Sequence, residues 1–273
     1  MELFGELAPS VVVGTAALAA LYFWAAHRLG RRPRRRQVAA FVCALLVMFL
    51  ALTGPLDELE DARLFTAHML QHLLLTLVVP PLLLAGLPDW MLRPVMLSRP
   101  VRPLAAFFTK PLVAFLSFAL IFTLAHHPLF YDLMCRNEAV HITFHLLFLT
   151  TGVMLWWPLL SPMAEFPRLS YPMQILYLFL LMIPMTAVGA PITMDRNVVY
   201  PWYAEGPHPW GISPIEDQVL GGLLMWVGQG LYMICVFTAV FRKWAQHEDR
   251  DNPPAERTTA DVRILRPVRK PGV

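Results

Sequence analysis

Two pairs of histidines carry the chemistry that this sequence suggests most directly. HMLQH, residues 68–72, and HITFH, residues 141–145, each place two histidines four positions apart at the head of a strongly apolar run. Side chains at i and i+4 lie one above the other on an α-helix, so each pair presents two imidazoles in one direction. Imidazole nitrogens are favoured ligands of copper, zinc and iron. The spacing therefore predicts a metal site at His68, His72, His141 and His145.

The same histidines also have a simpler interpretation. A histidine near a membrane interface can present its polar tip to the headgroups and its ring to the acyl boundary. Ionisable side chains inside membrane helices are costly and usually serve a functional site, so a repeated pair at one depth favours metal or haem binding. Four ligands on one ion require the two helices to lie side by side, which the sequence does not show.

Membrane-spanning helices must position these histidines. The chain has 273 residues, of which 57% are hydrophobic and 15% charged, and the apolar residues are gathered into long runs. A helix needs about 17–25 mostly apolar residues to cross a bilayer core of about 30 Å. The sequence predicts an all-α bundle of seven transmembrane helices, at Ser10–His27, Gln37–Leu52, Phe65–Leu87, Pro111–Ala125, Val140–Trp157, Met173–Val188 and Gln218–Phe241.

Two adjacent prolines interrupt the third of these spans. Pro80 and Pro81 remove two amide donors from the interior of the helix and should kink it. We expect the carbonyl groups freed in this way to turn toward neighbouring helices.

Basic residues orient the bundle, because Lys and Arg in short loops are retained on the cytoplasmic side. Residues 28–37 hold six arginines, residues 88–110 hold four basic residues, and the segment from Arg242 onward holds eight. Arg168 lies on the same side, and the opposite loops hold only Arg63, Arg136 and Arg196. We therefore predict an outside N terminus and an inside C terminus. Because the basic residues follow membrane topology, we expect no nucleic-acid binding.

This orientation brings seven of the nine histidines to or near the outer surface. His126 and His127, which follow the fourth span, either add ligands to the metal site or belong to a solvated turn. His208, in the last outer loop, is a further candidate ligand. The outer face therefore collects the candidate metal-binding side chains of the whole chain.

The last outer loop, residues 198–218, is rich in proline and aromatic residues. We expect it to form an interfacial lid, with Trp202, Tyr203 and Trp210 at headgroup depth. Asp217 ends this loop and opens the seventh helix. It either places a negative charge at the positive end of that helix or acts as a carboxylate that holds an imidazole ligand.

The chain divides into a seven-helix membrane domain, residues 1–244, and a tail, residues 245–273. The tail mixes both signs of charge with prolines, so we expect a flexible, charged cytoplasmic segment. The leader before the first span carries Glu2 and Glu6 and no basic residue, so we expect the first helix to remain as an anchor.

Three blocks of the sequence resemble the signature blocks of the CtaG family of bacterial cytochrome c oxidase assembly factors. They cover residues 68–88, beginning HMLQH, residues 141–160, beginning HITFH, and residues 216–231, beginning EDQVL. The resemblance implies a multi-pass protein of the bacterial inner membrane that helps to mature a haem-copper oxidase and handles copper. By motif it extends to His68, His72 and His145, less closely to His141, and to Asp217 with Gln218.

One position departs from the family pattern. WVGQG, residues 226–230, lacks the proline that we expect near Gly228, which leaves the local shape of the seventh helix open. The first two spans and the tail carry little of the resemblance.

The leading hypothesis is a metallochaperone without enzymatic activity. Outer-face imidazoles would take copper in the periplasm, or receive it from a soluble copper carrier, and present it to a cytochrome c oxidase subunit in the lipid bilayer. The sequence leaves open whether the site lies within one chain or is shared across a homodimer.

Two alternatives belong to other functional classes. A seven-helix zinc hydrolase acting on a lipid would use about three imidazoles, an activated water and a nearby carboxylate such as Asp217. A b-type haem protein would use one histidine from each of two helices as axial ligands. The i, i+4 spacing argues against haem, because axial ligands approach the iron from opposite faces.

Overall fold

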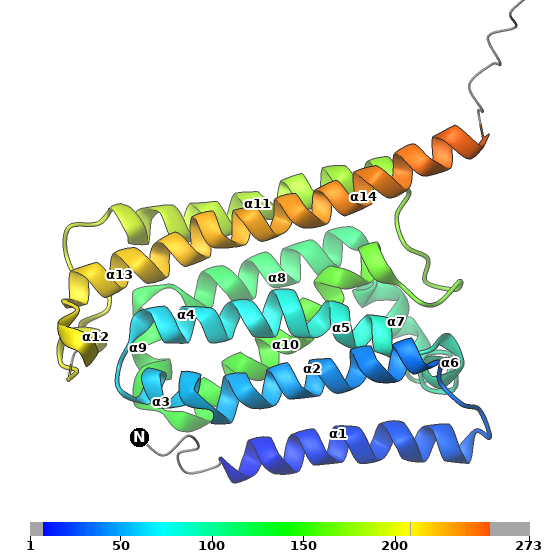
Figure 1. Cartoon of the computed structure of the whole chain (residues 1–273), viewed down its shortest axis with the longest axis horizontal. Coiled ribbons are helices and arrows are strands. Elements are labelled where there is room, and N and C mark those ends of the chain that lie inside the picture. The colour runs from blue at the N-terminus through cyan, green and yellow to red at the C-terminus, as the bar shows by residue number, and fades with distance from the viewer. Residues whose placement is uncertain (1–7, 208, 252–273) are drawn as a thin grey trace, which may run out of the picture.

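A computed structural model describes residues 8–207 and 209–251, and the regular secondary structure in this part of the chain is all helical. Long helices run side by side, alternating in direction along the chain, and short helices lie at both ends of the bundle (Figure 1). The long elements are α1 (Pro9–Arg28), α2 (Arg35–Thr53), α4–η1–α5 (Phe65–Leu73, Leu74–Val78 and Val79–Gly86), α8 (Pro111–Ala125), α10 (Glu138–Leu160), α11 (Tyr171–Met194) and α13–η3–α14 (Pro214–Leu223, Leu224–Gly228 and Gln229–Asp251).

The short helices divide between the two ends of the bundle. At one end lie α3 (Pro55–Asp61), α9 (Pro128–Arg136) and α12 (Pro201–Ala204), and at the other lie α6 (Asp89–Met96) and α7 (Arg102–Phe108) (Figure 1). A single turn, η2 (Pro209–Gly211), precedes α13.

Six helices in the described residues are long and apolar enough to cross a membrane. The pair α7 and α8, which meet at a bend of 74°, adds a seventh when it is counted as one span. Alone, the 15 residues of α8 reach only about 22 Å at 1.5 Å per residue, which is short of a bilayer core. The predicted all-α membrane bundle is confirmed, and the seventh predicted span depends on this bent pair.

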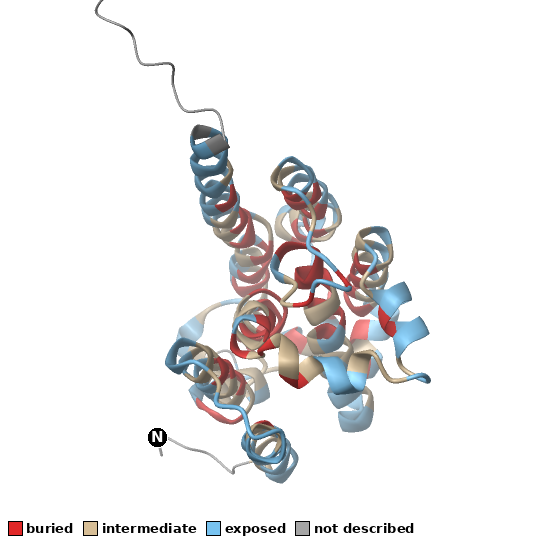
Figure 2. Ribbon diagram, turned by 90° about the vertical axis from the view of Figure 1, so that its right-hand side faces the viewer, coloured by how far each residue is buried: buried red, intermediate tan, exposed pale blue. Residues whose placement is uncertain are grey.

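Buried residues face the middle of the bundle and exposed residues cover its outer faces (Figure 2). Many of the exposed side chains are large and apolar, as expected for surfaces that face lipid. Helix α1 is peripheral and is held through Tyr22, whose ring stacks on Phe41 and whose hydroxyl donates to the carbonyl of Gly86. The core therefore lies among the helices that follow α1.

The carbonyls freed by the two prolines of the third span are bonded by neighbouring helices, as predicted. The prolines follow the π-helical turn η1, and they leave the carbonyls of Thr76 and Leu77 without the amide donors of a regular helix. The indole Nε1 of Trp156 donates to Thr76 at 2.9 Å, and the hydroxyl of Tyr232 donates to Leu77 at 2.6 Å. Side chains from α10 and α14 thus replace the missing bonds and tie three spans together.

A second π-helical turn, η3, lies in the last span at the position where the family pattern predicts a proline. It covers Leu224–Gly228, so the helix is locally widened although no proline is present. Such turns are rare and are frequently found at functional sites.

Small residues let the histidine-bearing helices approach their neighbours. A Cβ on Gly152 of α10 would lie 2.9 Å from the side chain of Pro80, and one on Gly221 of α13 would collide with the ring of Phe65. At both positions a residue larger than glycine would clash with its neighbour. The glycines therefore set the distance of α10 and α13 from the third span.

The N-terminal end of α4 is capped by a residue from another helix. Leu64 occupies the N-cap and offers no side-chain acceptor. The carboxylate of Asp217, on α13, accepts hydrogen bonds from the amides of Phe65 (2.6 Å) and Thr66 (3.0 Å) and from the Thr66 hydroxyl (2.7 Å). A buried carboxylate thus accepts hydrogen bonds from backbone amides that have no partner within α4, and its negative charge lies at the positive end of that helix.

The last span extends beyond the predicted boundary of the membrane domain. Helix α14 continues to Asp251, so the first residues of the predicted tail 245–273 are helical. Residues 252–273 lie outside the described residues, and the division at residue 244 remains a prediction.

Replacing Asp217 with alanine should destabilise the protein. The loss of a buried, charged acceptor leaves two amides of α4 without partners, which corresponds to about 2–4 kcal/mol. We expect a clearly lower thermal midpoint of the purified protein in detergent. Glu216→Ala is the matched control, because Glu216 is exposed and bonds only to Ser213 of its own cap. Equal midpoints for the two variants would contradict the assigned role of Asp217.

Candidate metal centre

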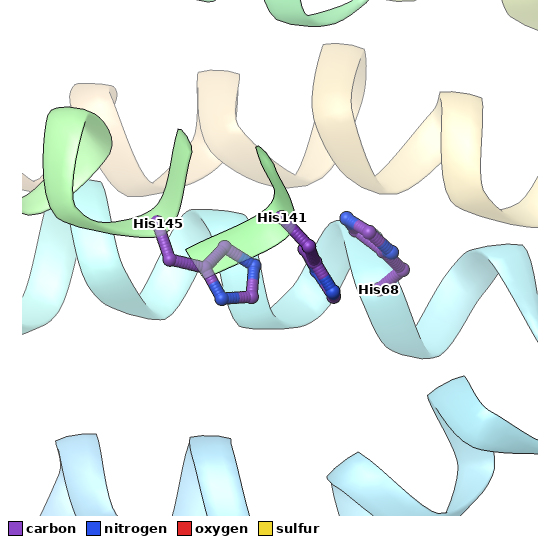
Figure 3. Close-up of side chains that lie close together, drawn as sticks. All are labelled: His68, His141 and His145. Carbon is purple, nitrogen blue, oxygen red and sulfur yellow. The ribbon is translucent and has the colours of Figure 1, made fainter. Parts of the chain in front are cut away.

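The two HxxxH pairs converge at one end of the bundle. His68 and His72 lie on α4, and His141 and His145 lie near the start of α10. Figure 3 shows the rings of His141 and His145 beside that of His68, between the two helices. The ring centroid of His68 lies 5.1 Å from that of His141 and 5.9 Å from that of His145. The third and fifth predicted spans are thus neighbours, as a shared site requires.

Three of these histidines form a group of the right size for one ion. One nitrogen from each of His68, His141 and His145 lies within 4.8 Å of the other two. Two nitrogens bound to one ion at about 2.0–2.1 Å with a tetrahedral angle lie about 3.3 Å apart, so small ring movements suffice to bind. Nε2 of His141 and Nε2 of His145 are buried without a hydrogen-bond partner. Buried polar atoms are normally satisfied, so this donor set fits a metal ion.

His72 is in contact with the group but is not part of it. Its Nε2 lies 2.7 Å from Nε2 of His68, with ring centroids 4.3 Å apart. The structure therefore separates the four predicted ligands into three that converge and one that hydrogen-bonds to a member of the three.

Two side chains that the sequence did not single out hold the ring of His68. Its Nδ1 lies 3.0 Å from a carboxylate oxygen of Glu60 and 3.2 Å from the hydroxyl of Tyr203. A carboxylate only accepts hydrogen bonds, so Nδ1 carries a proton, and in the neutral ring Nε2 keeps its lone pair. Metal-binding histidines are commonly oriented in this way by a carboxylate on the other nitrogen.

The three other candidate histidines, His126, His127 and His208, differ in their positions. His126 is buried, with its ring centroid 5.5 Å from that of His72 and its Nδ1 2.7 Å from the carbonyl of Phe122. Burial lowers the pKa of His126 to about 4, so its ring is neutral at physiological pH. His127 is exposed and begins α9, facing Phe130 instead of the cluster. His208 lies outside the described residues.

Asp217 takes a role that neither sequence interpretation anticipated. Its side-chain hydrogen bonds in the described structure go to the start of α4 and not to an imidazole. It therefore positions His68 and His72 through the helix that carries them, and the sequence of its own helix alone does not reveal this contact.

The loop that carries α12 lies against the histidines, and its aromatic residues are buried to different degrees. Tyr203 of α12 is buried, and its hydroxyl lies 2.7 Å from that of Tyr131. Trp210 is 72% exposed, whereas Trp202 is half-buried, and their predicted headgroup depth stays a prediction. The expectation for Tyr203 was wrong because its hydroxyl finds partners inside the bundle.

Two arginines fix α12 in place. The guanidinium of Arg63 lies 3.8 Å from the ring centroid of Trp202, and that of Arg136 lies 5.3 Å from it. Arg63 also pairs with Glu205 at 3.4 Å. These contacts join α12 to the turn before α4 and to α9, and they close the loop over the histidines.

A model of the cytochrome c oxidase caa3 assembly factors (Caa3_CtaG) matches residues 20–247. The chain belongs to this family. The matched residues include Glu60, both π-helical turns and the five histidines of the cluster, which are His68, His72, His126, His141 and His145. The resemblance predicted from three sequence blocks is confirmed, and the chain is a multi-pass membrane protein.

The curated relatives of this chain are longer proteins. Uncharacterized proteins of Mycobacterium bovis and Mycobacterium tuberculosis are each 28% identical to it over 224 residues, which is 76% of this chain and 33% of the relative. An uncharacterized protein of Mycobacterium leprae is 25% identical over 286 residues, which is 93% of this chain and 41% of the relative. The chain thus spans between a third and about two fifths of these relatives. No solved structure gives a significant match.

Loosening α12 should expose Cys135, which lies on α9 next to this loop. Burial, with a contribution from the charge of Glu60, raises the pKa of the Cys135 thiol to about 12. The thiolate is the reactive form, so Cys135 should be alkylated very slowly at pH 8. Trp202→Ala removes the ring that both arginines contact. We therefore expect the alkylation of Cys135, measured by mass spectrometry, to accelerate about tenfold or more.

Trp210→Ala provides the control for this experiment, because Trp210 is exposed and lies outside the arginine contacts. It should leave the alkylation rate unchanged. If Trp202→Ala were also without effect, Trp202 would not hold the loop closed.

Proposed function

We propose that this assembly factor binds copper at His68, His141 and His145 and delivers it to a cytochrome c oxidase. The proposal is supported chiefly by the convergence of imidazoles from two spans into one buried group, in a family defined by oxidase assembly. Copper is the cargo of the protein and not a permanent cofactor. The chain would act as a metallochaperone, without catalysing a reaction.

The donor set favours copper over other common metals. Imidazole suits copper, zinc and iron, and among first-row divalent ions copper binds such sites most tightly. The pairing of Glu60 with His68 fixes one ligand in its metal-binding tautomer and adds a negative charge beside the site. The site therefore combines neutral ligands with one compensating carboxylate.

We further propose that the histidine end of the bundle faces the periplasm. It carries α3, α9 and α12, whereas the connections at the opposite end contain the arginine-rich residues 28–37 and the basic residues of 88–110 (Figure 1). Copper would then arrive from the periplasm, directly or from a soluble carrier, and leave to an oxidase subunit in the same membrane. A transfer of this kind does not require the ion to cross the bilayer.

A zinc hydrolase is the second candidate, and one observation favours it. Glu60 brings a carboxylate to a three-histidine group, which is the composition of many hydrolytic zinc sites. This carboxylate is engaged with Nδ1 of His68, so it orients a ligand and is not free to activate water. Zinc in the purified protein together with turnover of lipid amides or esters would support the hydrolase instead.

A b-type haem fits the arrangement poorly. Axial ligands approach the iron from opposite faces of a flat macrocycle. Here the ring centroid of His72 lies 4.3 Å from that of His68, and the centroid of His145 lies 4.3 Å from that of His141. These rings fill the space that a porphyrin plane would occupy.

The first test measures metal in the purified protein. From copper-replete cells we expect at least one copper ion per chain in detergent, and about one fewer per chain in the variant with His68, His141 and His145 replaced by alanine. The exposed His127 serves as the control, and His127→Ala should retain the full amount. Equal copper in the triple variant and the wild type would contradict the assigned site.

The second test measures the oxidase itself. In cells that carry only the triple variant, we expect assembled cytochrome c oxidase to contain less copper and to lose activity in proportion. An oxidase with its full copper content in these cells would rule out delivery through this site, even if the site binds copper in vitro.

The orientation has a separate test. A fluorescent protein that folds only in the cytoplasm should fluoresce when fused to the C terminus, and alkaline phosphatase at the same position should be inactive. The opposite pair of results would place the histidine end in the cytoplasm and exclude uptake from the periplasm.

A further inference from the structure

The five clustered histidines exceed the number that one ion requires, and His72 and His126 remain after the three-histidine group is assigned. We propose that they form a second copper site, specific for Cu(I), which lies beside the first. The inference deepens the proposed function, because it adds a second position for the same cargo. His72 comes from α4 and His126 from the end of α8, so the site would join two spans.

The hydrogen bonds fix the tautomer of His72. Nδ1 of His68 donates to Glu60, so Nε2 of His68 is an acceptor. In the metal-free protein, the short contact of 2.7 Å between the two Nε2 atoms then requires His72 to be the donor, a hydrogen bond that an ion bound to Nε2 of His68 would replace. Nδ1 of His72 is left with a lone pair, and it is buried without a hydrogen-bond partner.

The same reasoning applies to His126. Its Nδ1 lies 2.7 Å from the carbonyl oxygen of Phe122, which can only accept, so Nδ1 carries the proton. Nε2 of His126 therefore also holds a lone pair, and it too is buried without a partner. Both side chains are more than nine-tenths buried. Each ring thus keeps one nitrogen in the form that binds a metal.

The spacing of the two rings suits a shared ion. An imidazole bound at about 2.0–2.1 Å has its centroid about 3.2 Å from the metal, so two rings on one ion lie about 4.5–6.4 Å apart. The centroids of His72 and His126 are 5.5 Å apart, within this range. Phe148 lies 4.5 Å from His72, and Phe122 lies 4.5 Å from His126, so apolar rings surround the pair.

A site with two imidazoles in an apolar setting selects the oxidation state of the ion. Cu(I) is stable with as few as two or three nitrogen ligands, whereas zinc takes four ligands. His145 belongs to the three-histidine group, and its ring centroid lies 5.4 Å from that of His72, so the two sites are in direct contact. Two cations this close repel each other, and we expect the second to bind at least about tenfold more weakly.

The test is an anaerobic titration of the full chain in detergent with Cu(I), set against a chromogenic Cu(I) chelator. All samples carry Cys43→Ser, Cys135→Ser and Cys235→Ser, because thiolates also bind Cu(I). We expect two Cu(I) per chain in this background and one after His126→Phe, which keeps an aromatic ring in place. The adjacent, exposed His127→Phe is the matched control and should still bind two.

A zinc titration of the same background needs no further variant and is independent of whether His126→Phe folds. We expect one zinc ion per chain, at the three-histidine group. Binding of only one Cu(I) that is lost in His141→Ala would overturn the second site and leave the proposed function standing. Two Cu(I) retained in His126→Phe would also overturn it, and no copper binding at all would overturn both.

Discussion

The position of the histidine cluster depends on the carboxylate of Asp217, which holds the first turn of α4. Its three hydrogen bonds to Phe65 and Thr66 join the last span to the third at the depth where the histidines begin. One turn further along the same helix lie His68 and then His72. A helix end buried without such a cap leaves unsatisfied amides, which lipid cannot solvate. The cap therefore fixes the depth of two imidazoles as well as the helix.

The cluster combines polar atoms that are hydrogen-bonded with nitrogens that are free to bind a metal. Four of its nitrogens, on His72, His126, His141 and His145, are buried without a hydrogen-bond partner. An unsatisfied buried polar group costs about 1–3 kcal/mol, so the metal-free cluster is an expensive arrangement. Coordination by an ion removes that cost at each nitrogen it binds, which gives the apolar surroundings a direct role in affinity. A set of merely structural histidines would be expected to find partners.

Much of this arrangement could be predicted from the sequence, and the remainder shows what a sequence does not contain. The i, i+4 pairs identified His68 and His145, and the prolines at 80 and 81 predicted carbonyls bonded by neighbouring helices. Local pattern sufficed there. Glu60 could not be found in this way, because its contact with His68 depends on a turn in which Arg63 adopts a left-handed φ of 59°. Packing between distant segments likewise placed Tyr203 inside and set His72 apart from the group.

The closed loop over the cluster links access to affinity. Tyr203 belongs to α12, which the arginine contacts of Trp202 hold in place, and its hydroxyl lies 3.2 Å from Nδ1 of His68. Any movement of α12 that opens a route to the histidines therefore also removes one of the two groups that orient a ligand. A metal carrier must hold its ion tightly until an acceptor is present and then release it. Under the proposed function, placing a ligand-orienting hydroxyl on the covering segment would meet both needs, because the site would be weakest when it is exposed.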